Sequence, residues 1–127
     1  MLLVEHHTEA REALAAVLSA SFDLVGVLDS VDSIERHVAE YKVEVVALDI
    51  DVQAKTGVAG VQRILEWFPD VKVIALSSIA DAVYVREIFK AGAAGYVLKL
   101  RAAGDLPQAV NETTGGRRYV SPSVGLG

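Results

Sequence analysis

The stretch Val43-Glu44-Val45-Val46-Ala47-Leu48-Asp49-Ile50 decides the fold class of this chain. It is the most continuous apolar run in the sequence, and its Val, Ala and Leu residues do not alternate regularly with polar ones. Such a pattern is typical of a parallel β-strand that is buried on both faces of a sheet. Asp49 stands at the carboxyl end of this predicted strand.

Shorter apolar runs lie on both sides of this strand and alternate with segments of helical periodicity. Further strands are predicted at 2–4, 24–28, 71–76 and 95–98. Helices are predicted from Thr8, from Asp32 to Tyr41, over 57–68, over 81–91 and from about Asp105. The last helix is expected to start late, because Pro107 is tolerated only in a first turn. Alternating strands and helices need right-handed crossovers, so the sequence predicts a parallel sheet with helices on both faces.

The length and composition exclude several classes of protein. A chain of 127 residues suffices for one domain with a single core, and a hydrophobic share of 52% is too high for a disordered segment. The chain has no cysteine, which excludes disulfides, thiolate zinc sites and thiol catalysis and fits a reducing compartment. A net charge of −5 argues against a nucleic-acid surface. No apolar run suits a membrane helix or a signal peptide, so a cytoplasmic protein is expected.

Polar residues follow the predicted strands at the points where the strands end. They are Glu5, His6 and His7 after the first strand, Asp49 and Asp51 at the third, Ser77 and Ser78 at the fourth, and Lys99 at the fifth. In doubly wound sheets, ligands bind at the carboxyl ends of the strands. A phosphoryl group can be held there, with Asp49 as the nucleophile and Ser77 and Lys99 as ligands of the phosphoryl oxygens. No glycine-rich phosphate loop follows any strand, which disfavours nucleotide and flavin sites.

Four segments and Ser77, in the right order and at the right intervals, match a known pattern. Leu2-Leu3-Val4-Glu5-His6-His7 resembles a first-strand motif that ends in two acidic residues, and Val46-Ala47-Leu48-Asp49-Ile50 resembles a strand that carries a phosphoacceptor aspartate. The segments AGAAGYVLK (91–99) and GGRRYVSP (115–122) complete the pattern. Together they resemble the response-regulator receiver domain, of the subfamily that is usually joined to a LuxR/NarL-type helix-turn-helix domain.

The resemblance implies a flavodoxin-like, doubly wound α/β fold. It has a five-stranded parallel sheet of order 2-1-3-4-5 with helices on both faces. Residues 1–116 would form the receiver domain, and residues 117–127 would begin a linker. The linker-like ending favours a chain cut from a longer protein, in which DNA binding belongs to a C-terminal domain outside this sequence.

The resemblance also implies a two-component phosphorelay with a transcriptional output. Asp49 would accept a phosphoryl group from a sensor histidine kinase with the help of Mg²⁺. Ser77 would then turn toward the phosphate, Tyr96 would follow inward, and Lys99 would pair with a phosphoryl oxygen. A homodimer is also expected, whereas an interaction with a membrane is not. Beyond self-catalysed phosphotransfer to Asp49 and dephosphorylation, the domain is not expected to be an enzyme.

The metal half of the site departs from the family's pattern. In the family the second acid after the first strand holds Mg²⁺ directly, and here that position is His6. Magnesium prefers oxygen ligands in octahedral geometry, so an imidazole at this position should weaken its binding. The remaining candidate ligands are Glu5, Asp49 and the backbone carbonyl of Asp51.

Three other interpretations stay open at this point. A pseudo-receiver would act without phosphorylation as a dimerisation or ligand-regulated module, with a protonated His6 neutralising the crowded carboxylates in place of the ion. A small flavodoxin-like enzyme or cofactor carrier is disfavoured by the missing phosphate loop. A transition-metal pair of His6 and His7 is disfavoured because adjacent residues of a strand point to opposite faces. In addition, Gln53 replaces the family's usual proline four residues after the acceptor, so the loop at 52–56 is expected to differ in shape.

Overall fold

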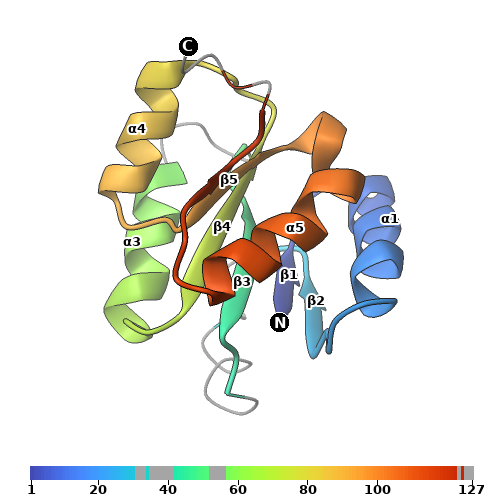
Figure 1. The fold of residues 1–127 in the computed structure, drawn as a ribbon. Coiled ribbons are helices and arrows are strands. Elements are labelled where there is room, and N and C mark those ends of the chain that lie inside the picture. The colour runs from blue at the N-terminus through green and yellow to red at the C-terminus, as the bar shows by residue number, and fades with distance from the viewer. Residues whose placement is uncertain (31–33, 35–41, 52–56, 123, 125–127) are drawn as a thin grey trace.

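The computed structural model describes residues 1–30, 34, 42–51, 57–122 and 124, and these residues form a parallel sheet covered by helices on both faces (Figure 1). Along the sheet, the strands are β2 (Gly26–Leu28), β1 (Leu2–Val4), β3 (Val45–Asp49), β4 (Lys72–Ser77), β5 (Gly95–Leu98) and β6 (Tyr119–Val120). Every pair of neighbouring strands is parallel. The predicted α/β fold and the order 2-1-3-4-5 are therefore confirmed.

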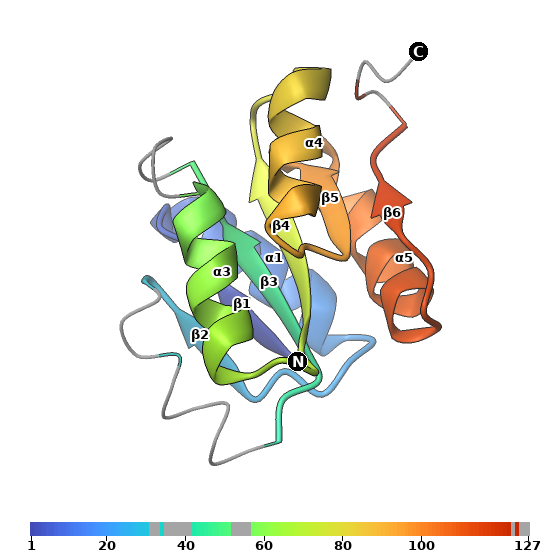
Figure 2. The same cartoon turned by 90° about the vertical axis from the view of Figure 1, so that its left-hand side faces the viewer.

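The described helices cover the sheet in pairs. Helices α1 (Thr8–Ser19) and α5 (Ala102–Thr114) lie against one face, and α3 (Gly57–Trp67) and α4 (Ala82–Lys90) lie against the other, as the two views show (Figures 1 and 2). The helix predicted from Asp32 to Tyr41 and the loop with Gln53 fall outside the described residues, apart from the buried Ile34. No helix in the described ranges is both long and apolar enough to cross a membrane.

Strand β3 lies in the middle of the molecule, as its apolar sequence predicts. Successive side chains of a strand point to opposite faces, so Val46 and Leu48 join the core under α3 and α4, while Val45 and Ala47 join the core under α1 and α5. All five residues of β3 are buried. Both faces of this strand are covered, and its last residue, Asp49, reaches the carboxyl edge of the sheet.

Helix α5 begins earlier than the sequence indicates. A 3₁₀ turn, η3 (Lys99–Arg101), leads directly into α5 at Ala102, so Pro107 lies inside the helix and not in its first turn. A helical N–H at position 107 would bond to the carbonyl of Ala103, and Ala103 is exposed, so water can take that bond. The helix also buries Ala102, Leu106, Ala109 and Val110 against the sheet, which offsets the cost of the proline.

A sixth strand extends the sheet beyond the five that were expected. Tyr119 and Val120, in the segment assigned to a linker, pair with Gly95 and Tyr96 of β5. The Oγ of Ser121 accepts a hydrogen bond from the N–H of Leu98 at 3.0 Å and donates one to Oδ2 of Asp105 at 2.9 Å. A strand of two residues is too short to show a period in sequence, which explains why β6 was not predicted.

Candidate functional site

The polar residues predicted at the strand ends meet at one edge of the sheet. Glu5 follows β1, Asp49 is the last residue of β3, Ser77 is the last residue of β4, and Lys99 follows β5. Parallel strands present their carboxyl ends at the same edge, so residues far apart in the sequence become neighbours. The side chains of Glu5 and Asp49 are each 1% exposed, and that of Lys99 is 17% exposed.

The Lys99 ammonium lies among three carboxylates. Its Nζ is 2.8 Å from Oδ1 of Asp49, 3.1 Å from Oε1 of Glu5 and 3.8 Å from Oδ2 of Asp51. Burial disfavours the charged form of Lys99, but the contacts with Asp49 and Glu5 outweigh it and hold its pKa above the ordinary value. Lys99 is therefore a cation at this edge, and it partly neutralises the carboxylates.

Glu5 and Asp49 divide the remaining charge unequally. Burial, together with the neighbouring Asp49 carboxylate, raises the pKa of Glu5 to about 7. Burial acts in the same direction on Asp49, but hydrogen bonding to Glu5, to Lys99 and to two backbone N–H groups holds the pKa of Asp49 below its ordinary value. Those N–H groups belong to Asp51, 2.9 Å from Oδ1, and to His6, 3.2 Å from Oδ2. Asp49 is thus the ionised, nucleophilic member of the pair, whereas Glu5 gains and loses its proton near neutral pH.

A hydrogen-bonded chain runs from Asp51 to Tyr96. Ser77 Oγ donates to Oδ1 of Asp51 at 2.6 Å, and the N–H of Ile79 donates to Ser77 Oγ at 3.0 Å. The hydroxyl of Tyr96 donates to the carbonyl of Ile79 at 2.6 Å. Tyr96 is fully buried, and burial raises its pKa to about 12. The four residues therefore connect the acidic edge to the segment that precedes α4.

The two histidines lie side by side beyond the end of β1. The His7 ring, not that of His6, faces the site, with Nδ1 3.7 Å from Oε1 of Glu5 and 3.5 Å from Nζ of Lys99. His6 contributes its backbone N–H to Asp49, and its exposed ring lies edge-on to the His7 ring with centroids 5.4 Å apart. The expectation that the two rings point to opposite faces was wrong because β1 ends at Val4, and both histidines lie beyond the strand.

A group of ligand atoms at this edge suits a divalent cation in charge and spacing. One ligand atom each from Glu5, His7 and Asp49 lies within 4.8 Å of the others. Both carboxylate oxygens of Glu5 are buried; Oε1 pairs with the Lys99 ammonium, whereas Oε2 has no hydrogen-bond partner among the described residues and is available to a cation. The carboxylate oxygens suit Mg²⁺, whereas the imidazole nitrogen suits it less well. The donor set therefore fits Mg²⁺ through Glu5 and Asp49, with no ligand from the side chain of His6.

Two contributors escaped the sequence analysis. The sequence places Asp51 at the strand end and assigns a role to its backbone carbonyl, but it does not show that the Asp51 carboxylate accepts hydrogen bonds from Ser77 and, at 2.7 Å, from the N–H of Ser78. Its position two residues after Asp49, just past the strand end, was a usable signal. No feature of the sequence distinguished His7 from His6, because the turn after β1 decides which ring lies beside Glu5 and Lys99.

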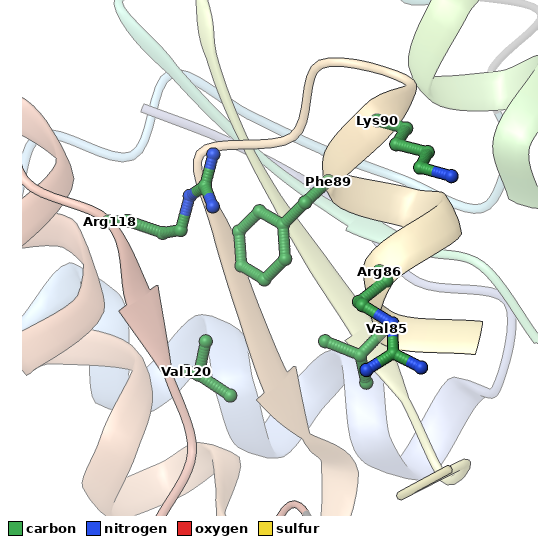
Figure 3. Close-up of a pocket in the computed structure, with 6 residues that line it drawn as sticks. All are labelled: Val85, Arg86, Phe89, Lys90, Arg118 and Val120. Carbon is green, nitrogen blue, oxygen red and sulfur yellow. The ribbon is translucent and has the colours of Figure 1, made fainter. Parts of the chain in front are cut away.

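A second feature lies away from the acidic edge, between α4 and β6. Figure 3 shows a cleft lined by Val85, Arg86, Phe89, Lys90, Arg118 and Val120. The Arg118 guanidinium stacks on the Phe89 ring, 4.5 Å from its centroid. The cleft thus has an apolar floor with cationic side chains around it.

Comparisons with known proteins agree with this geometry. A family model described as "Response regulator receiver domain" matches residues 1–111. The chain is 30% identical over 126 residues to the transcriptional regulatory protein DegU of Brevibacillus brevis, covering 98% of this chain and 53% of that protein. It is 28% identical to the response regulator GacA of Pseudomonas viridiflava, covering 98% of this chain and 59% of that protein. This chain therefore spans little more than half the length of these relatives.

Solved structures show the same fold. The isolated REC domain of RcsB from Salmonella enterica serovar Typhimurium, in the apo form, matches with a TM-score of 0.86 at 19% identity, covering 97% of this chain and 92% of that one. A LuxR-family two-component response regulator from Aurantimonas sp. SI85-9A1 matches with a TM-score of 0.86 at 23% identity, covering 97% and 89%. These neighbours confirm the expected fold.

Proposed function

We propose that this chain, which belongs to the response regulator receiver domain family, accepts a phosphoryl group on Asp49 and thereby switches a downstream output. The observation that carries the proposal is the ionised Asp49 carboxylate at the sheet edge, 2.8 Å from the Lys99 ammonium. The proposed donor is the phosphohistidine of a sensor histidine kinase.

The proposed reaction needs a nucleophile and donors for the transferred group. An Asp49 oxygen attacks phosphorus, the N–P bond of the phosphohistidine breaks, an O–P bond forms, and the imidazole leaves with the electron pair of the broken bond. Lys99 lies beside Oδ1 of Asp49 and can stabilise charge on the phosphoryl oxygens. The Ser77 hydroxyl, which lies at the end of the neighbouring strand β4, is the second proposed ligand.

Mg²⁺ is proposed to bind at Glu5, Asp49 and the backbone carbonyl of Asp51. When bound, the ion would supply positive charge between the carboxylates and the incoming phosphoryl group. Glu5 supports this assignment because its Oε2 is buried and has no hydrogen-bond partner in the part of the chain that the structure describes. The side chain of His6 is not among the candidate ligands. Mg²⁺ is therefore expected to bind more weakly here than at a site with two acidic residues after the first strand.

A specific observation favours a second candidate, the pseudo-receiver. Lys99 contacts three carboxylates, and the raised pKa of Glu5 lowers the negative charge of the site further near neutral pH. The site is thus partly neutralised without an ion. The role considered for a protonated His6 falls instead to Lys99, because the His6 ring is exposed and only the His6 backbone N–H contacts Asp49.

The output is proposed to lie in a larger protein. The relatives are named as transcriptional and response regulators and are longer than this chain, so DNA binding is assigned to a further domain. Residues 1–116 are proposed as the receiver and 117–127 as the start of the linker, with Tyr119–Ser121 of that segment docked on the sheet. A cytoplasmic location and a homodimer complete the proposal.

Intact mass after incubation with acetyl phosphate tests the proposed function. The parent and Asp49→Ala are compared with and without Mg²⁺. A gain of one phosphoryl group by the parent alone is expected, and its dependence on Mg²⁺ reports whether Glu5 suffices in the metal site. No gain under any condition would reject the phosphoacceptor assignment and favour the pseudo-receiver.

A further inference from the structure

The Asp51 carboxylate occupies a set of donors that converge from two strand ends. Oδ1 accepts the hydroxyl of Ser77 at 2.6 Å, and Oδ2 accepts the N–H of Ser78 at 2.7 Å. The Lys99 ammonium lies 3.8 Å from Oδ2. A hydroxyl, a backbone N–H and an ammonium together form a site for an oxyanion, because hydrogen bonds to charged acceptors are the stronger ones.

This donor set lies next to Asp49. Lys99 contacts Oδ1 of Asp49 at 2.8 Å, and the N–H of Asp51 donates to the same oxygen at 2.9 Å. A phosphoryl group on Asp49 would carry its charge into the region of Lys99 and Ser77. The Asp51 carboxylate already holds these donors, so the two anions compete for the same partners.

The same carboxylate is connected to the buried tyrosine. Ser77 Oγ donates to Asp51 and accepts the N–H of Ile79 at 3.0 Å, so the direction of its hydroxyl is determined on both sides. The carbonyl of Ile79 accepts the hydroxyl of Tyr96 at 2.6 Å, and Tyr96 is 0% exposed. The segment between β4 and α4 is therefore held in place from Asp51 at one end and from Tyr96 at the other.

We propose that the Asp51 carboxylate is the resident anion of the site formed by Ser77, Ser78 and Lys99, and that it holds Tyr96 inward while Asp49 is unphosphorylated. The chain thus supplies from its own sequence the negative charge that phosphorylation would bring. Phosphorylation of Asp49 then has to displace the Asp51 carboxylate from Ser77. The competition with a phosphoryl group rests on the proposed function; the hold on Tyr96 does not.

The test follows Tyr96 by ¹⁹F NMR in full-length protein labelled with 3-fluorotyrosine. The Tyr96 resonance is assigned by its loss in Tyr96→Phe, and burial is read from the change in shift between H₂O and D₂O, which only an exposed fluorine shows. Asp51→Asn keeps the shape of the side chain and removes its charge, whereas Asp51→Ala removes both acceptors. Asp70→Asn, at an exposed turn residue, is the matched control for loss of one negative charge.

A buried Tyr96 is expected in the parent and in Asp70→Asn without any phosphodonor. A charge-assisted hydrogen bond is worth about tenfold or more in an equilibrium constant, so both Asp51 variants should raise the outward population of Tyr96 by at least about tenfold. A Tyr96 resonance that stays buried in both Asp51 variants, with circular dichroism like that of the parent, would overturn the inference. If Asp51→Ala fails to fold, the shape-preserving Asp51→Asn gives the same decision.

Intact mass after acetyl phosphate treatment of the same samples separates the two proposals. Release of Tyr96 without any phosphoryl gain supports the resident anion and rejects the acceptor role of Asp49. Phosphoryl gain with Tyr96 unmoved in the Asp51 variants rejects the resident anion and supports the acceptor. Both proposals together predict faster phosphorylation of Asp51→Asn than of the parent, because the competing charge is gone.

Discussion

Replacing Glu5 by Gln is expected to stabilise the folded chain at alkaline pH. The side chain is fully buried, and its pKa is raised from the ordinary value of 4.5 to about 7. Between these values the folded state binds more protons than the unfolded state, so stability falls as pH rises from about 4.5 and levels off above about 7. The difference in pKa corresponds to about 3 kcal/mol, of which about 2 kcal/mol lies between pH 5 and pH 8. Gln resembles the protonated acid in shape and cannot ionise, so Glu5→Gln avoids this loss.

The assay is urea unfolding in EDTA at pH 5 and pH 8, followed by the fluorescence of the single tryptophan, Trp67. The free energy of unfolding of Glu5→Gln relative to the parent should be about 2 kcal/mol more favourable at pH 8 than at pH 5. Glu12→Gln, at an exposed position on α1, is the matched control and should show no such change. An equal difference between Glu5→Gln and the parent at both pH values would refute a protonated, buried Glu5.

Three further substitutions test other contacts. Asp81→Ala removes the side chain that accepts the N–H groups of Val83 and Tyr84 at the start of α4. The free energy of unfolding in urea should fall by about 1 kcal/mol. The control Asp70→Ala, at an exposed turn, should not show this loss. Ser121→Ala removes the hydrogen bonds to Leu98 and Asp105, so the free energy of unfolding should fall by about 1–2 kcal/mol. Hydrogen exchange of the Leu98 amide should become faster. An unchanged exchange rate at Leu98 would contradict the docking of β6. Lys99→Met leaves the carboxylates without their cation, so the free energy of unfolding should fall by about 3 kcal/mol at pH 8. The loss should be smaller at pH 5, where Glu5 is protonated. A loss that does not depend on pH would contradict the ion pairs.

Most of the fold could be predicted because its central strands, β1, β3 and β4, are almost entirely buried. The unbroken apolar run of β3 carries that signal, and the polar residues that end β1, β3, β4 and β5 then fall at one edge by topology alone. Glu5, Asp49, Ser77 and Lys99 were all placed in this way.

The parts that were missed depend on contacts that no short window of sequence contains. Strand β6 exists because Tyr119 and Val120 pair with β5, and the early start of α5 depends on burial that outweighs Pro107. The position of the exposed His7 ring beside Glu5 depends on the bend after Val4. The acceptor role of the Asp51 carboxylate likewise depends on how close the ends of β3 and β4 come to each other.

Borohydride trapping tests the central claim, the acceptor role of Asp49, most directly. Borohydride reduces an aspartyl phosphate to homoserine, and peptide sequencing by mass spectrometry then identifies the modified position. After treatment with acetyl phosphate, homoserine is expected at position 49, with none in Asp49→Asn. Homoserine at position 51 or elsewhere, or at no position under conditions that modify a receiver of known activity, would contradict the assignment.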